Sequence, residues 1–167
     1  VQMDFTFVDK LKILTLYTMG KQFGSATVVV SKSADKFCVE WAVRQMENWQ
    51  LKGIVLRTDQ EQSIQAIAGL IRDRREQPTV LQEVPRRAHQ ALGGVERWHR
   101  LLQEQIRALK LELEKKVGEI SSTDALSTWL VRHSVWVLFR YHRSQTMGST
   151  AYFRLHGTEC SEPLVHY

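Results

Sequence analysis

The spacing of apolar residues changes along the chain, and this change limits the folds that the chain can adopt. Near the start, Met3, Phe5 and Phe7 alternate with polar residues, a period of two that indicates a strand with one buried face. Two further apolar segments, 13–17 and 26–30, follow after short connections. Three neighbouring strands joined by short turns predict an antiparallel meander.

Beyond this meander the apolar residues recur every three or four positions. Ser33 is expected to cap a first helix, and the apolar run within 54–58 predicts a buried parallel strand. A helix capped by Asp59 and a strand at 79–84 follow. The rest predicts helices at 90–117, at 123–141 with Thr123 as its cap, and at 151–156. We therefore expect an α/β fold with a five-stranded mixed sheet, three antiparallel strands plus parallel strands, flanked by helices.

Length and composition favour a single domain. The chain has 167 residues with only 3 Pro and 9 Gly, so we expect one domain over residues 1–167. Cys38 and Cys160 are far apart, which argues against a disulfide framework or a cysteine-based zinc site and favours a reducing, intracellular compartment. No apolar run approaches the length of a membrane span. Because Val1 already lies inside a strand pattern, we expect a fragment of a longer polyprotein.

Positive charge is concentrated in one segment. The net charge is +5, and residues 86–116 hold eight Lys or Arg against four Glu. A basic stretch on one element indicates a polyanionic partner, nucleic acid first. The alternative is an ordinary solvated helix face.

Three carboxylates stand inside a strand, at a strand end or at a helix start. Asp4 lies inside the first strand, Asp59 follows the buried strand, and Glu96 lies near the start of the basic helix. Carboxylate oxygens suit Mg²⁺, and three of them can hold two ions for an in-line phosphoryl displacement. Taken singly, Asp59 with Gln62 also fits a helix cap, and Glu96 also fits a surface pair with Arg100. Asp4 is harder to explain structurally, because Asp is depleted inside strands.

The basic helix presents cations on the same face as Glu96. Arg100, Gln103, Arg107 and Lys110 follow Glu96 at helical spacing, away from the apolar stripe. Such a face can follow a phosphate backbone, and Gly93-Gly94 would let that backbone approach closely. His89 and His99, beside the arginines, are predicted to lie on the solvated surface or to contact phosphate.

These features together resemble the catalytic core of retroviral and retrotransposon integrases, members of the ribonuclease H-like superfamily. The resemblance rests on Met3-Asp4-Phe5, Thr58-Asp59 and Gly93-Gly94-Val95-Glu96-Arg97, on Pro85 and Gln90 in the preceding loop, and on the segment 150–157. It covers nearly the whole chain. It implies that Asp4, Asp59 and Glu96 are catalytic and bind two Mg²⁺ or Mn²⁺ ions. It also implies DNA contacts, made by Arg100 and Gln103, with Arg97, Arg107 and Lys110 as auxiliary phosphate contacts and Gln90 in the loop.

The implied function is nicking and strand transfer that join the DNA ends of a mobile element to target DNA, in the nucleus. Two alternatives stay open: a ribonuclease H-like nuclease, and an inactive domain kept for DNA binding or oligomerisation. We also expect a homodimer or higher oligomer, because the second half of the chain carries surplus apolar residues, namely Trp129, Val135, Trp136 and Phe139.

Overall fold

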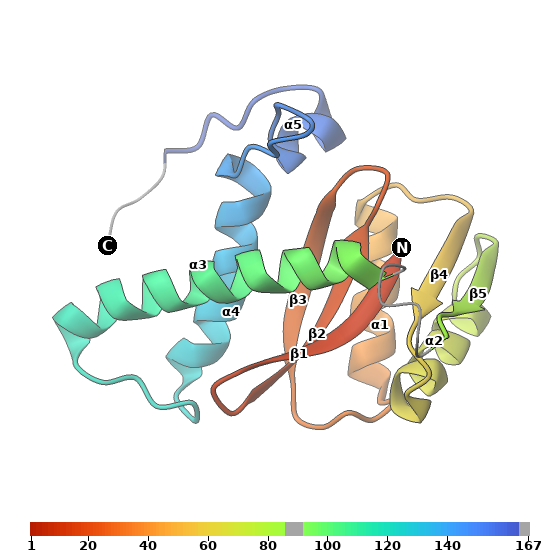
Figure 1. Cartoon of the computed structure of the whole chain (residues 1–167), viewed down its shortest axis with the longest axis horizontal. Helices are drawn as coiled ribbons and strands as arrows, with labels where there is room; N and C mark the ends of the chain where they lie inside the picture. Colours follow the sequence, from red (N-terminus) through yellow and green to blue (C-terminus); the bar gives the residue numbers. More distant parts are fainter. Residues whose placement is uncertain (86–91, 164–167) are drawn as a thin grey trace.

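A five-stranded mixed sheet forms the centre of the computed structural model, which describes residues 1–85 and 92–163 (Figure 1). Its strand order is β3-β2-β1-β4-β5. Strands β1 to β3 are antiparallel, whereas β4 runs parallel to β1 and β5 runs parallel to β4. The strands are β1 (Gln2–Val8), β2 (Leu11–Thr18), β3 (Phe23–Val29), β4 (Ile54–Thr58) and β5 (Thr79–Glu83). The predicted fold class is confirmed.

Helices cover both faces of this sheet (Figure 1). One face carries α1 and α2, which share a core with Met3, Phe5 and Leu14. The other face carries α3 and α4, which pack on Val8 and Ile13. The helices are α1 (Lys36–Asn48), α2 (Gln62–Arg74), α3 (Gly93–Val117), α4 (Ala125–Tyr141) and α5 (Ala151–His156). In the part of the chain that the structure describes, no helix has the length and apolar character that crossing a bilayer requires.

Strand β1 is buried on both faces, which corrects the prediction of one buried face. Gln2 is 0% exposed and Thr6 is 6% exposed, although both occupy the polar positions of the alternation. In contrast, Phe7 at the end of the apolar set is 48% exposed. The reason is position, because β1 is the central strand and α3 lies over its polar side.

Three predicted helix caps are wrong by one or two residues. The side chain of Asp35 caps α1 in place of Ser33, by accepting from the backbone N–H of Cys38 at 2.8 Å. Asp124 caps α4 in place of Thr123. Helix α2 begins after Glu61, and Asp59 is not its cap. Asp59 therefore lies outside the helix, in the turn that follows β4.

Candidate functional site

Asp4 and Asp59 lie at the same level of the sheet. Parallel strands β1 and β4 pair with Gln2 opposite Arg57, and the two acids follow two residues later on each strand. The negative charges of Asp59 and Glu61 are close enough to Asp4 to raise the pKa of its carboxyl group. The structure therefore brings together two of the three acids that the sequence singled out.

The Asp4 carboxyl group is partly withdrawn from water. Burial is the main cause that raises its pKa from 3.8 to about 6, and the charges of Asp59 and Glu61 add to the rise. Two influences act the other way: the backbone N–H of Phe5 donates to Oδ1 at 2.7 Å, and Lys32 lies nearby. A buried carboxylate beside a second one is stabilised by a cation, and hard oxygen donors suit Mg²⁺ or Mn²⁺. The Asp4–Asp59 pair thus fits a divalent ion.

Asp59 and Glu61 are held by the turn after β4. Oδ1 of Asp59 accepts from the backbone N–H of Glu61 at 3.0 Å, which shapes the turn. Glu61 forms an ion pair with Lys32 at 2.8 Å and accepts from the hydroxyl of Ser63, and the Lys32 hydrogen bond is the main cause that lowers its pKa. The ammonium group of Lys32 also lies 5.2 Å from the ring centroids of Phe5 and Phe7. Sequence analysis did not single out this lysine, because it lies in the connection between β3 and α1, far from Glu61 in the chain.

Glu96 is not part of this pair. It lies in the first turn of α3 with its side chain exposed. Over residues 1–85 and 92–163, no three His, Cys, Asp or Glu side chains form a group that could hold a metal ion. The loop residues Gln90 and His89 lie outside the described residues. Glu96 as third metal ligand therefore stays a prediction.

Helix α3 is attached to the sheet directly beside Asp4. Oε1 of Gln2 accepts from the backbone N–H of Val95 at 2.8 Å. A Cβ atom on Gly94 would lie 2.5–2.8 Å from Met19, Gln2 and Tyr17, so only glycine permits this contact. The expected role of Gly94 in DNA approach is thus replaced by a packing role. Its neighbour Gly93 has room for a side chain.

His99 is buried, contrary to the predicted surface position, and joins α3 to Asp4 through one hydroxyl group. The Thr15 hydroxyl donates to the carbonyl oxygen of Asp4 at 2.7 Å, and its oxygen lies 2.7 Å from Nε2 of His99. Since a hydroxyl has one proton, Nε2–H of His99 is the donor to Thr15. Burial lowers the pKa of His99 to about 4, so the ring is neutral at pH 7.

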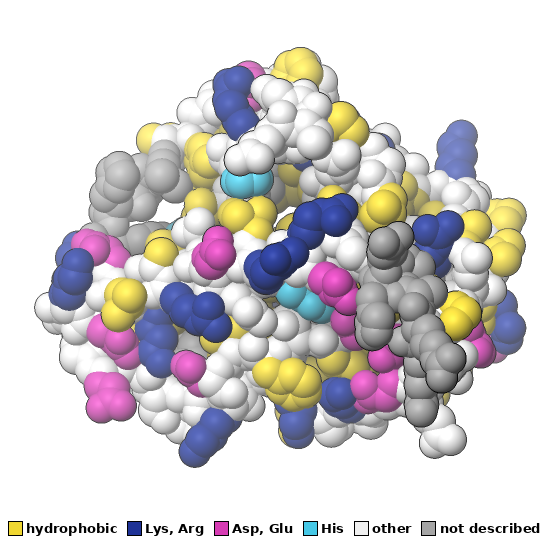
Figure 2. All heavy atoms as spheres, viewed as in Figure 1, with side chains coloured by type: hydrophobic (Ala, Val, Ile, Leu, Met, Phe, Trp, Pro, Cys, Tyr) yellow, Lys and Arg dark blue, Asp and Glu magenta, His cyan; other side chains and the backbone are white. Residues whose placement is uncertain are grey.

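The predicted DNA-contacting residues divide into two groups. Arg97, Arg100 and Arg107 have exposed side chains. Figure 2 shows Lys and Arg side chains gathered along the middle of the molecule, where Figure 1 places α3. Gln103, however, donates to the Thr6 hydroxyl at 2.9 Å and to the carbonyl of Phe7 at 3.3 Å. Lys110 forms an ion pair with Asp9 at 2.9 Å. These two residues attach α3 to β1 and to the turn after it.

The catalytic core domain of BIV integrase, among solved structures, has a similar fold. The TM-score is 0.62 at 20% sequence identity, and the match covers 92% of this chain and 91% of that chain. No protein-family model and no curated protein sequence matches the chain. The resemblance read from the sequence is therefore confirmed for the fold, which is the ribonuclease H-like fold of integrase cores.

Proposed function

We propose that this chain is a divalent-metal-dependent polynucleotidyl transferase of the integrase type, which nicks DNA and joins element ends to target DNA. The observation that carries the proposal is the Asp4–Asp59 pair, in which burial and the neighbouring charge raise the pKa of Asp4 to about 6. The similarity to the BIV integrase core adds support at the level of the fold. Since the substrate is DNA, we expect the protein to act in the nucleus.

Asp4 and Asp59 would hold Mg²⁺ or Mn²⁺, with Glu96 as the third ligand. Such ions supply polarisation of the phosphoryl oxygens and stabilisation of the attacking and leaving oxygens. The chain's own residues set the ligand positions: the backbone N–H of Phe5 orients Asp4, and the turn at Glu61 orients Asp59. Lys32 pairs with Glu61 and so reduces the negative charge beside the two aspartates.

Arg97, Arg100 and Arg107 would contact the phosphate backbone of DNA. Their guanidinium groups form no ion pair with any described residue, so their charge is available to a polyanion. We propose that Gln103 and Lys110 support this interface without contacting DNA themselves. Through their bonds to β1 and Asp9 they hold the helix in place beneath the arginines.

An assay of Mn²⁺-dependent nicking and strand transfer on labelled DNA tests the enzyme directly. Asp4→Asn, Asp59→Asn and Glu96→Gln should each abolish both reactions. Glu104→Gln, an exposed position on the same helix, should leave them unchanged. If Glu96→Gln retained wild-type activity, Glu96 would have no part in the chemistry.

An inactive DNA-binding domain is the second candidate, and it is favoured by one observation. The described residues contain no group of three potential metal ligands. Calorimetric titration with Mg²⁺ and Mn²⁺ separates the two candidates. Binding heat that is lost in Asp59→Asn supports the enzyme. An absence of heat, together with intact DNA binding, supports the binding domain. A nuclease of the same fold would nick DNA in the first assay without joining ends.

The predicted oligomer would use α4. Val135 and Phe139 pack against the protein's own core and are partly buried. Trp129 is 36% exposed and stacks on His133, which in turn stacks on Trp136. We propose that this aromatic row meets a second copy of the chain. Sedimentation of wild type should show a dimer, and Trp129→Ala should shift it toward monomer; a wild-type monomer at tens of micromolar would contradict the proposal.

A further inference from the structure

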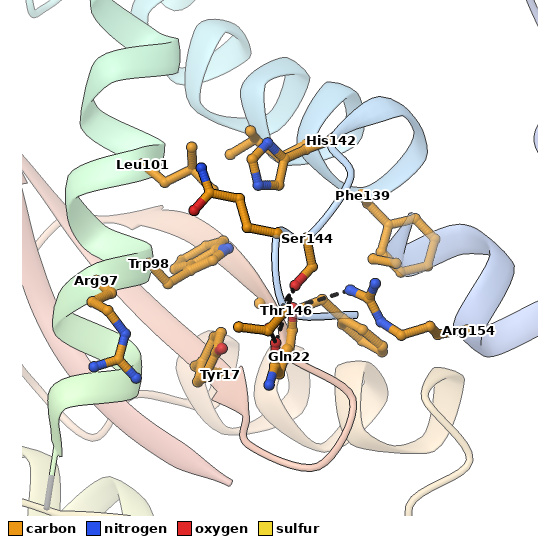
Figure 3. Close-up of a pocket in the computed structure, with 15 residues that line it drawn as sticks. Tyr17, Gln22, Arg97, Trp98, Leu101, Phe139, His142, Ser144, Thr146 and Arg154 are labelled. Atoms are coloured by element: carbon orange, nitrogen blue, oxygen red, sulfur yellow. Dashed lines mark hydrogen bonds between the residues drawn. The ribbon is translucent and has the colours of Figure 1, made fainter. Parts of the chain in front are cut away.

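A cavity lies directly beside the start of α3. It has a volume of about 250 Å³ and is enclosed by α3, the end of α4, α5 and the turn between β2 and β3 (Figure 3). Arg97 and Trp98 line it, and these residues follow Glu96 directly in the helix. None of the residues assigned above to metal binding lines this cavity. Its chemistry is therefore separate from that of the Asp4–Asp59 pair.

The cavity carries positive charge without a compensating carboxylate. Its lining contains two arginines, Arg97 and Arg154, and no Asp or Glu among the described residues. The Arg154 guanidinium donates to backbone carbonyls of Lys21 at 2.7 Å and Gln22 at 3.2 Å, which are neutral acceptors. Both arginines lie close enough to the Tyr17 phenol to act on its pKa: burial raises this pKa, and the two positive charges lower it. Such a cavity favours an anionic ligand.

Aromatic rings form much of its wall. Figure 3 shows Trp98 and Tyr17 on the side of α3 and the sheet, with Phe139 and His142 arriving from α4. Trp98 is 6% exposed and Tyr17 is half-buried, so packing holds both rings in place and only part of each ring borders the cavity. Flat rings beside a cation suit a ligand that combines a planar base with a phosphate.

Three polar side chains that line the cavity are held in place by hydrogen bonds to one another. Oε1 of Gln22 accepts from the hydroxyls of Ser144 at 3.1 Å and Thr146 at 2.6 Å (Figure 3). This leaves the Nε2 donors of Gln22 without a partner in the described part of the chain. The Tyr17 hydroxyl and the exposed amide of Gln145 also border the space. Donors and acceptors of this kind can recognise the edge of a base.

We propose that this cavity binds an unpaired nucleotide at the end of a DNA strand. Arg97 contacts its phosphate, and its base lies among Tyr17, Trp98 and His142. This inference rests on the proposed function, because it requires that the end of a DNA strand is bound at the start of α3, where Arg97 of the cavity directly follows Glu96. It adds a site that selects frayed or overhanging ends over blunt duplex.

Fluorescence anisotropy with labelled duplexes of one sequence tests the proposal. One duplex is blunt, and the other carries a short single-stranded overhang. We expect the overhang to improve affinity about tenfold, the size that base stacking gives. His142→Ala and Gln145→Ala should remove most of this gain and leave binding to the blunt duplex unchanged. Gln77→Ala, an exposed glutamine that does not line the cavity, is the matched control.

Equal affinity for both duplexes, or an undiminished gain in both variants, would overturn the proposal. An overhang without bases tests stacking separately: a full gain from abasic residues would reduce the site to a phosphate contact and refute base binding. Competition by free dAMP at micromolar concentration would assign the cavity to a free nucleotide instead of a DNA end. The binding assay requires no nicking. Glu96→Gln should therefore keep the gain in affinity that the overhang gives, and a loss of nicking activity is measured separately.

Discussion

The side-chain oxygen of Gln2 accepts from the backbone N–H of Val95 at 2.8 Å, across a sequence separation of 93 residues. Gln2 is two residues before Asp4, and Val95 is one residue before Glu96. This bond therefore couples the strand that carries the first acid to the helix that carries the third. A buried side chain does here what a helix cap does elsewhere, since it satisfies a free N–H of the first turn of α3.

Gly94→Ala should destabilise the protein. A Cβ atom would collide with Met19, Gln2 and Tyr17 and push α3 away from β1, at a cost of about 1–3 kcal/mol in the free energy of unfolding. Gly93→Ala is the matched control in the same turn, where only the flexible Arg97 side chain comes near. It should be neutral or stabilising by up to about 1 kcal/mol. Urea unfolding of both variants measures the difference, and equal effects would contradict the packing role of Gly94.

Asp4→Asn should stabilise the protein at neutral pH. The folded pKa of Asp4, about 6, lies above its ordinary value of 3.8. Below pH 3.8 the group is protonated in both states, so it costs nothing. As pH rises from 3.8 to about 6, the unfolded chain releases this proton first, so the folded state loses stability until its own buried group ionises. The variant should therefore gain about 3 kcal/mol over wild type at pH 7 and almost nothing at pH 3.5. Chemical unfolding at both pH values checks this, and a pH-independent difference would refute it.

His99→Gln should show the opposite pH dependence. The folded pKa of His99, about 4, lies below its ordinary value of 6.5. Its neutral form gives stability that is present above pH 6.5 and is lost as pH falls toward 4, because the unfolded chain takes up a proton first. Wild type should lose about 3 kcal/mol over this range that the variant does not lose. The glutamine amide can still donate to Thr15. Parallel pH profiles for the two proteins would show that His99 does not titrate in this window.

Arg100→Ala and Gln103→Ala should affect different properties. Arg100 is exposed, so its loss should weaken DNA binding and lower the slope of affinity against salt by about 1. Gln103 is bonded to Thr6 and Phe7, so its loss should cost about 1–2 kcal/mol of folding stability. Anisotropy at several salt concentrations and urea unfolding measure the two effects. The assignment fails if Gln103→Ala changes the salt slope and leaves stability unchanged.

Local sequence patterns predicted most of the fold. The period-two run around Met3, the apolar run at 54–58 and the stripe of α3 each lie within one element, and the elements were placed in the right order. The helix caps were placed one or two residues early at Ser33 and Thr123. Neighbouring polar residues in a turn have nearly equal capping propensities, so the backbone conformation decides among them.

The partners of the acids were not predictable in the same way. Lys32 reaches Glu61 from a different loop, and His99 meets Thr15 across a sequence separation of 84 residues. His99 stands beside arginines in the sequence and was predicted to be exposed to solvent, because its sequence neighbours do not show that the sheet packs against its ring. Phe7 was expected in the core, but it is 48% exposed. The alternation of apolar residues does not show which part of β1 the helices cover.

The sequence by itself determined the order of strands and helices and the candidate acids Asp4 and Asp59, because periodicity and residue type are properties of short segments. Tertiary structure decided that those two carboxylates share one site and that Gln103 attaches α3 to β1. It also decided that a positively charged cavity opens beside Glu96. Each of these depends on how strands and helices far apart in the chain come to lie against each other, since charge coupling and burial act through space.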